Sequence, residues 1–181
     1  MTALETRTIH TPRMGVHYRS HGATSRFPML LVHGSFASGR WWEPLMALLP
    51  DEIWAVAPDL RGCGQSEKNE IGYRIEEQAE DLGAFIDAMR MGNIDLVAHS
   101  SSAAIAIEYA LNHSDRLATL TLVNPAPLEG ITTPADGVNA LEQMRTDWAL
   151  LRDGLAAMMP SFMRDTPEEV RFFDQLVADA A

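Results

Sequence analysis

Short apolar runs alternate with helical patterns along residues 28–123, and this alternation limits the folds that the chain can adopt. The runs have the length and the turn-residue boundaries of strands buried on both faces, and they cover residues 28–32, 53–57, 94–98 and 117–123. The helical patterns between them cover about residues 39–49, 74–90 and 101–112. Strands that alternate with helices form βαβ units, so we expect an α/β fold in which helices flank a mostly parallel sheet.

Both ends of the chain depart from this alternation. Two short alternating segments, residues 6–10 and 15–20, predict an antiparallel hairpin at the start. Beyond residue 124 the patterns are helical and cover residues 138–159 and 167–180, with a break at Met159-Pro160.

The apolar face of these last helical patterns is rich in methionine, and it includes Met144, Trp148, Leu151, Leu155, Met158 and Met159. Ordinary helix packing is the favoured explanation, because methionine fills gaps in cores. A lid over the strand ends, with a lining that meets a substrate, is the other, and both can hold together. We expect a core with strands one to six at residues 1–125 and a helical cap or lid at residues 126–181.

Composition excludes some classes of partner. A chain of 181 residues that is 46% apolar can bury one good core. Its net charge of -11 argues against nucleic acid and anionic membranes as partners. Cys63 is the single cysteine, which excludes an internal disulfide and suits a reducing compartment. The first residues do not resemble a signal peptide and no apolar run could span a bilayer, so a cytoplasmic location is expected.

The segment Ala98-His99-Ser100-Ser101-Ser102 joins an apolar run to an Ala-rich helical pattern. A serine with small residues two positions away on each side, at a strand-to-helix turn, is the pattern of a nucleophile elbow. The turn is sharp and its backbone strained, so bulky neighbours would clash. A lone serine after a strand is more often a helix N-cap. The motifs upstream favour the nucleophile, and Ser100 is the candidate.

A second motif, His33-Gly34-Ser35-Phe36, follows an apolar run directly. Acyl transfer needs two backbone N–H groups aimed at the carbonyl oxygen as it becomes an oxyanion. In an elbow architecture one donor follows the nucleophile, here Ser101, and the other lies in the loop after the third strand. We assign the second donor to Ser35, with Phe36 as the near alternative. Trp41, Met144 and Trp148 are the candidate substrate-pocket residues.

A third motif, Asp59-Leu60-Arg61-Gly62-Cys63-Gly64-Gln65-Ser66, follows the run at residues 53–57. Its glycines permit backbone conformations that other residues resist, and Asp59 and Arg61 can tie the loop to its neighbours. Structural support is favoured over catalysis, because arginine cannot act as a base near neutral pH. Cys63 has no histidine pattern around it, so a reactive thiol is not favoured.

With these motifs in this order, the chain resembles the α/β-hydrolase superfamily, in the branch of serine esterases, haloperoxidase-like enzymes and carbon–carbon bond hydrolases. Ala98, Ser102 and Ala103 stand where that family usually has glycine, which leaves the helix less room to approach the sheet. Serine at position 100 argues against the dehalogenase and epoxide hydrolase branches, which use a carboxylate nucleophile. The resemblance specifies no substrate.

The resemblance also implies an acid and then a histidine after the nucleophile, and the histidine is missing. All six histidines lie at or before position 113. We expect His99 to point into the scaffold, His33 to belong to the oxyanion loop, and His113 to lie far from Ser100. Glu129 and Asp136 follow the sixth expected strand, residues 117–123, where some relatives place their acid, but no histidine follows for them to orient.

Two further βα units would complete the fold, and without them residues 117–123 form an exposed edge strand, which is a pairing hazard. Three explanations are open: the chain is the front part of a longer hydrolase, another chain supplies the missing part, or the protein is a non-catalytic relative. The first is favoured, because the sequence ends within a helical pattern.

The expected function is acyl transfer through an acyl-enzyme, on a small and apolar ester-like substrate, without a metal or an organic cofactor. Because the members of a catalytic triad act together, losing the base costs orders of magnitude in rate. We therefore expect weak or no hydrolysis by this chain alone. The alternative is a non-catalytic protein that binds a ligand in the same pocket. Besides a small-molecule substrate, the partner that the open sheet edge could take is a second copy of the chain or a complementing chain.

Overall fold

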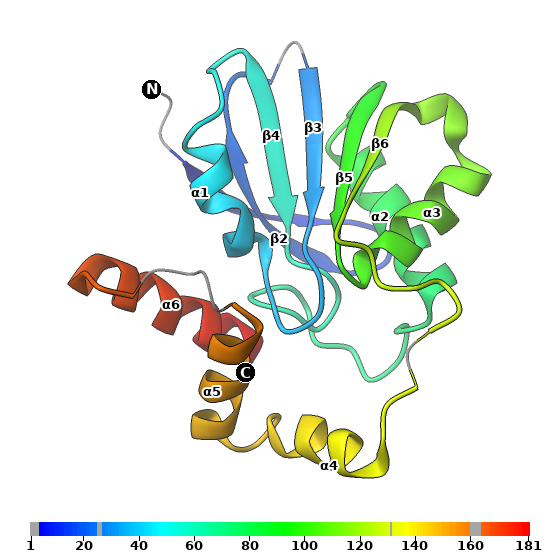
Figure 1. Cartoon of the computed structure of the whole chain (residues 1–181). Coiled ribbons are helices and arrows are strands. Elements are labelled where there is room, and N and C mark those ends of the chain that lie inside the picture. The colour runs from blue at the N-terminus through cyan, green and yellow to red at the C-terminus, as the bar shows by residue number, and fades with distance from the viewer. Residues whose placement is uncertain (1–3, 25–26, 131, 160–163) are drawn as a thin grey trace.

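The protein forms a six-stranded sheet in the order β1-β2-β4-β3-β5-β6, shown in Figure 1. The computed structural model describes residues 4–24, 27–130, 132–159 and 164–181, and the side chains of Phe27 and Asp136 lie outside the description. The strands are β1 (Glu5–His10), β2 (Gly15–His21), β3 (Phe27–Val32), β4 (Ile53–Pro58), β5 (Ile94–His99) and β6 (Leu117–Val123). β1 and β2 form the expected hairpin, β2 pairs antiparallel with β4, and β4, β3, β5 and β6 run parallel. The predicted α/β fold with a mostly parallel sheet is confirmed.

Helices lie on both faces of this sheet and beyond one of its ends. The helical elements are η1 (Gly39–Trp42), α1 (Glu43–Met46), α2 (Ile75–Ala88), α3 (Ser102–Asn112), η2 (Ser114–Arg116), α4 (Ala135–Gln143), α5 (Trp148–Met158) and α6 (Pro167–Ala180). Within the described residues, no helix is long and apolar enough to cross a membrane.

Two predicted helices are divided in the structure. The one expected at residues 39–49 consists of a 3-10 turn, η1, and the short α1, because Pro44 has no N–H with which to continue a helix. The one expected at residues 138–159 divides into α4 and α5, because Asp147 accepts a hydrogen bond from the Leu150 N–H and so starts a new helix.

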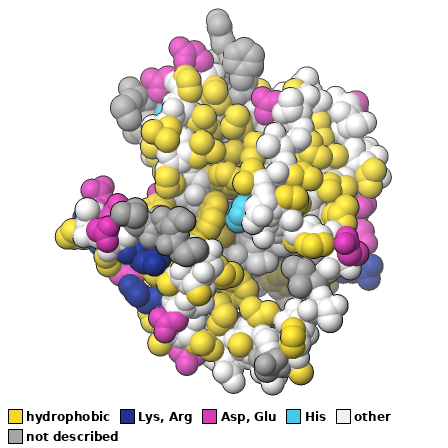
Figure 2. Space-filling model, in the orientation of Figure 1, with side chains coloured by type: hydrophobic (Ala, Val, Ile, Leu, Met, Phe, Trp, Pro, Cys, Tyr) yellow, Lys and Arg dark blue, Asp and Glu magenta, His cyan; other side chains and the backbone are white. Residues whose placement is uncertain are grey.

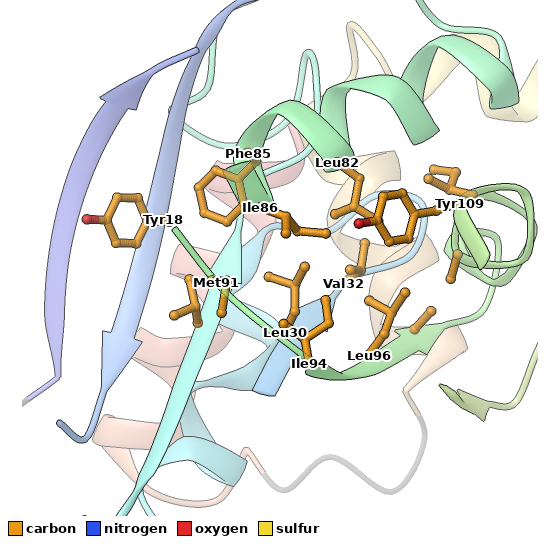
Figure 3. Packing of buried hydrophobic residues seen from close by; sticks show 14 of the residues in the cluster. Tyr18, Leu30, Val32, Leu82, Phe85, Ile86, Met91, Ile94, Leu96 and Tyr109 are labelled. Carbon is orange, nitrogen blue, oxygen red and sulfur yellow. The ribbon is translucent and has the colours of Figure 1, made fainter. Parts of the chain in front are cut away.

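Alternate residues of the central strands are buried on opposite faces of the sheet. Leu30 and Val32 of β3 face α2 and α3 in the larger core cluster, whereas Leu31 faces η1 and α1. Figure 3 shows the larger cluster, in which Phe85 and Ile86 of α2 lie over the sheet. Burial on both faces explains why these strands are continuous apolar runs in the sequence.

The register of the strands brings three loops together at the carboxyl end of the sheet. Val32 of β3 pairs with Ala98 of β5, and His99 of β5 pairs with Val123 of β6. The segments that follow β3, β5 and β6 therefore begin side by side. Helices α4, α5 and α6, hereafter the α4–α6 segment, lie beyond these strand ends (Figure 1).

β6 is the last strand of the sheet, and it pairs only with β5 among the described residues. Most of its side chains are exposed, Leu120 and Val123 included. The exposed edge expected from the sequence is therefore present in this part of the chain.

Candidate active site

Ser100 occupies a strained turn between β5 and α3. Its φ of 57° lies in the left-handed region, which a residue with a Cβ adopts only where the surroundings enforce it. The Ser100 N–H donates to the carbonyl oxygen of Val123 at 3.1 Å, and the Ser100 carbonyl accepts from the N–H groups of Ala103 and Ala126, both at 3.1 Å. These bonds to the end of β6 and the start of α3 hold the turn.

The hydroxyl of Ser102 ties the elbow to the neighbouring strand. Ser102 is fully buried, and its Oγ accepts a hydrogen bond from the His99 N–H at 3.1 Å. The same hydroxyl lies 3.1 Å from the carbonyl oxygen of Val32 and 2.9 Å from that of His99, and can donate to either. The sequence indicated only that this residue is small; the structure gives its hydroxyl a positioning role between β3 and β5.

The loop after β3 approaches Ser100 closely because residue 34 is a glycine. A Cβ on Gly34 would lie 2.8 Å from the Cβ of Ser100, a distance that real structures do not tolerate. The Ser35 hydroxyl donates to the Ser101 Oγ at 2.9 Å, which links this loop to the residue after Ser100. Among the described residues, the backbone N–H groups of Ser35, Phe36 and Ser101 donate to no acceptor.

His33 fixes the base of this loop. Its ring is fully buried, its Nδ1 lies 2.8 Å from the carbonyl oxygen of Gly34, and its Nε2 accepts from the Leu60 N–H at 3.0 Å. Nδ1 therefore carries the proton and donates to Gly34. Burial lowers the pKa of His33, which keeps the ring neutral. Both nitrogens are thus engaged away from Ser100.

Ser100 opens into a cavity of 370 Å³ between the strand ends and the α4–α6 segment. The cavity is lined by Ser35, Phe36, Ala37, Trp41, His99, Ser100, Asn124, Leu155, Met158 and Met159. Figure 2 shows a histidine near the middle of this face, among apolar side chains. Most of the lining is apolar, which favours a ligand with an apolar body.

Of the candidate pocket residues, Trp41 lines this cavity but Met144 and Trp148 lie elsewhere. Met144 packs inside the α4–α6 segment against Leu151 and Leu155. Trp148 is 49% exposed at the start of α5. The sequence pattern identifies the apolar residues of this region. It does not specify how α4 and α5 are each rotated about their axes, because residues 144–147 divide the single helix that the pattern predicted. Among the described residues of this segment, Leu155, Met158 and Met159 line the cavity.

None of the six histidines forms a hydrogen bond with Ser100 within the described part of the chain. His113 is exposed beyond α3 and packs on Tyr109. The expectation that His99 points into the scaffold is wrong in one respect, because its ring is part of the cavity wall. Glu129 is exposed in the loop after β6, and the side chain of Asp136 lies outside the described residues.

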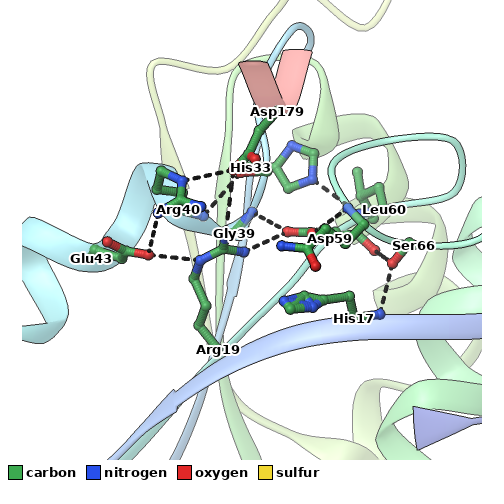
Figure 4. A network of polar contacts seen from close by, with 12 residues as sticks. His17, Arg19, His33, Gly39, Arg40, Glu43, Asp59, Leu60, Ser66 and Asp179 are labelled. Carbon is green, nitrogen blue, oxygen red and sulfur yellow. Dashed lines mark hydrogen bonds and ion pairs between the residues drawn. The ribbon is translucent and has the colours of Figure 1, made fainter. Parts of the chain in front are cut away.

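A buried network of charges joins the α4–α6 segment to the core, as Figure 4 shows. Asp179 of α6 accepts hydrogen bonds from the Ser38 hydroxyl at 2.7 Å, Arg40 Nε at 2.8 Å and Arg19 Nη2 at 3.3 Å. Arg19, only 1% exposed, also donates to Asp59 at 2.9 Å. Because Ser38 belongs to the loop after β3, the position of α6 is coupled to the loop that approaches Ser100.

The loop after β4 has the structural contacts expected of it. Asp59 accepts from the Gly39 N–H at 2.7 Å and the Gln65 N–H at 2.9 Å, and Arg61 makes two 2.7 Å bonds to Asp81. Burial raises the pKa of the Cys63 thiol to about 11, so this thiol is protonated near neutral pH and a poor nucleophile. Among the described residues, no cluster of three or more His, Cys, Asp or Glu side chains could hold a metal ion.

Comparison with known proteins identifies the family to which this arrangement belongs. A model of the alpha/beta hydrolase family matches residues 29–181. The chain belongs to the α/β hydrolase family. The resemblance inferred from the three motifs is thereby confirmed.

The chain is similar to several known proteins. It is 28% identical over 162 residues to a 2-(acetamidomethylene)succinate hydrolase of Mesorhizobium japonicum, covering 88% of this chain and 58% of the relative. It is 34% identical over 113 residues to a putative carbamate hydrolase, RutD, of Caulobacter vibrioides, covering 61% of this chain and 42% of the relative. The enol-lactonase structure from Burkholderia xenovorans superposes with a TM-score of 0.78 at 22% identity, over 96% of this chain and 68% of that one. The chain thus spans about half the length of the curated relatives named here.

Two residues at this site, His99 and Asn124, were not identified as cavity residues from the sequence. His99 stacks on Trp41, with 5.1 Å between ring centroids and 21° between planes, and this contact holds its ring in the cavity wall. Asn124, at φ 45°, reaches the cavity because β6 lies beside β5. The sequence indicates only that the apolar run at residues 117–123 ends before Asn124, and it gives no signal for the direction of the His99 ring.

Proposed function

We propose that this α/β hydrolase is a serine hydrolase that forms an acyl-enzyme with a small, uncharged, ester-like substrate. The observation that carries the proposal is Ser100 at φ 57°, held at the end of β5 and opening into a largely apolar cavity. A nucleophile at such a turn stands clear of its own strand, and the start of α3 favours a developing negative charge.

In the proposed mechanism, Ser100 Oγ attacks the substrate carbonyl and the carbonyl oxygen becomes an oxyanion. The N–H of Ser101 and that of Ser35, with Phe36 as the alternative, hold this oxyanion. Their lack of other acceptors among the described residues supports this role. The C–O bond to the leaving group breaks, this group takes up the proton that Ser100 gave to the base and departs as the alcohol, and water then releases the acyl group from Ser100 as the acid.

The charge of the cavity wall supports an uncharged substrate. Its described lining contains no Lys, Arg, Asp or Glu. Arg19 and Arg40 are not among the described lining residues, and both are paired with Asp179. A dicarboxylate such as the one named for the Mesorhizobium japonicum relative would have no cation to meet in this wall, and a buried unpaired carboxylate is costly. The α4–α6 segment contributes Leu155, Met158 and Met159 to the apolar lining, and we propose that it acts as a lid.

Acyl transfer also needs a base within hydrogen-bond reach of Ser100 Oγ. Because no histidine bonds to it in the described part of the chain, we propose that the base comes from outside residues 1–181. We therefore expect residues 1–181 alone to hydrolyse activated esters weakly or not at all.

Fluorophosphonate labelling with added imidazole tests this function. The labelled residue is located by peptide mass spectrometry, and Ser100→Ala is the matched control. We expect slow labelling at Ser100 that accelerates with imidazole, because imidazole can stand in for the absent base, and no label in the variant. A folded chain that stays unlabelled at Ser100 at high imidazole overturns the serine mechanism. Fast labelling without imidazole overturns the proposed origin of the base.

A non-catalytic binding protein is the second candidate, favoured by the lack of a histidine bonded to Ser100 in the described residues. Calorimetric titration with a neutral ketone distinguishes it. A receptor keeps its affinity in Ser100→Ala while showing no imidazole-dependent acylation of the unsubstituted protein.

A further inference from the structure

His99 gives the cavity a polar group that the proposed acyl transfer does not use. Its ring shares the cavity wall with Ser100, the residue that follows it. Trp41 stacks on the ring at 5.1 Å, and the ring of Trp42 meets it edge-on at 6.4 Å and 89°. Two tryptophans and the elbow backbone therefore fix the direction in which the ring nitrogens point.

The two ring nitrogens of His99 lie in different surroundings. Nδ1 is buried and has no hydrogen-bond partner among the described residues. The position that a Cβ of Gly34 would take lies 3.2 Å from it, so Nδ1 is packed against the loop after β3. Nε2 is not such a buried atom, and because His99 lines the cavity, Nε2 is the ring nitrogen that a ligand there can reach.

These surroundings select one tautomer. A proton on Nδ1 would leave a buried N–H without an acceptor, which costs more than leaving a lone pair unpaired. Burial lowers the pKa of His99, so the ring stays neutral near pH 7 and carries a single proton. That proton belongs on Nε2, where it can be donated into the cavity.

We propose that His99 is a specificity residue whose Nε2–H donates a hydrogen bond to an uncharged oxygen of the substrate, close to the scissile carbonyl. This rests on the function proposed above. The preferred substrate is then an ester or lactone with a second neutral acceptor, such as an ether or carbonyl oxygen, beside the carbonyl that Ser100 attacks. The rest of the wall, with Phe36, Leu155 and Met158, accepts the apolar remainder.

Two isosteric esters test the proposal. p-Nitrophenyl methoxyacetate differs from p-nitrophenyl butanoate by an ether oxygen in place of one methylene group. The rate of Ser100 acylation by each, with imidazole present, is measured by intact mass. His99→Phe keeps a flat ring against Trp41 but loses the N–H, and His113→Phe, at an exposed histidine beyond α3, is the control.

We expect the methoxyacetate-to-butanoate rate ratio to fall about 3- to 10-fold in His99→Phe, the value of one neutral hydrogen bond, and to stay unchanged in His113→Phe. A ratio that is equal in His99→Phe and the unsubstituted protein overturns the proposal. Failure of both esters to acylate the unsubstituted protein overturns the serine mechanism instead.

Nuclear magnetic resonance tests the histidine without turnover and without a variant that could fail to fold. Long-range ¹H–¹⁵N spectra at pH 7 are expected to show His99 as the Nε2–H tautomer. Methoxyacetone should shift its Nε2 resonance more than the isosteric 2-pentanone does. An Nδ1–H tautomer, an imidazolium, or equal shifts with the two ketones overturns the role of His99.

Discussion

Helices α2 and α6 both pack against the core, but the contacts that dominate differ. Leu82, Phe85 and Ile86 of α2 are buried in the larger core cluster (Figure 3), and a single buried carboxylate of this helix, Asp81, pairs with Arg61. α6 reaches the core through Asp179, which binds Ser38 and two arginines (Figure 4). Apolar burial is strong and non-directional, whereas a network of charge-assisted bonds fixes position. The difference indicates that α2 stabilises the fold and that α6 sets the geometry of the loop beside Ser100.

Arg19→Met tests the polar side of this comparison most severely. The substitution leaves the fully buried Asp59, together with Glu43 and Asp179, without the cation that all three share. We expect the free energy of unfolding to fall by about 3–5 kcal/mol, because an uncompensated buried charge remains. Urea denaturation measures it, and Arg7→Met, at an exposed pair with Glu5, should change stability by less than about 0.5 kcal/mol. Equal effects of the two substitutions would show that the network contributes nothing as a unit.

Leu96→Ala tests the apolar side. Leu96 of β5 is fully buried in the larger core cluster, and truncation leaves a cavity among packed neighbours. We expect a loss of about 2–4 kcal/mol in unfolding free energy. Leu111→Ala is the control, since that leucine is 76% exposed at the end of α3. A larger loss of unfolding free energy in Leu96→Ala than in Arg19→Met would show that apolar burial at this site outweighs the polar network.

The apolar packing of the strands could be predicted from the sequence, and the polar network around Asp179 could not. Leu30, Leu31 and Leu96 belong to runs whose local pattern already specifies strands buried on both faces, and the elbow follows one of these runs. Arg19 and Asp179 are 160 positions apart, and no local pattern connects them. The direction of the His99 ring depends on its stacking against Trp41, which is likewise a tertiary contact.

Asp179→Asn separates the two roles within one helix. Asparagine keeps the shape but loses the charge that Ser38, Arg40 and Arg19 share. We expect α6 to be destabilised by about 1–3 kcal/mol while α2 keeps its protection, as measured by amide hydrogen exchange. Asp174→Asn, at a half-exposed pair with Arg152, is the matched control on the same helix and should change little. Equal loss of protection in α2 and α6 would mean that the network stabilises the whole fold and not α6 in particular.

The smallest expected effect concerns His17, which lies beside the polar network. Both of its ring nitrogens are buried without hydrogen-bond partners among the described residues, and Figure 4 shows the ring next to Asp59 and Arg19. Burial lowers the pKa of His17; the negative charges of Asp59 and Asp179 oppose this, and Arg19 and Arg40 add to it. Because the pKa is lower in the folded state, the unfolded chain binds the proton more readily, so stability is lost as the pH falls below about 6.5.

Between pH 7 and pH 6 this histidine accounts for at most about 0.7 kcal/mol of the free energy of unfolding. His17→Gln should flatten the pH dependence of unfolding by that amount, whereas replacement of the exposed His113 by glutamine should leave it unchanged. A steeper loss of stability in His17→Gln would mean that the neighbouring carboxylates, and not the buried ring, control the acid sensitivity of this region.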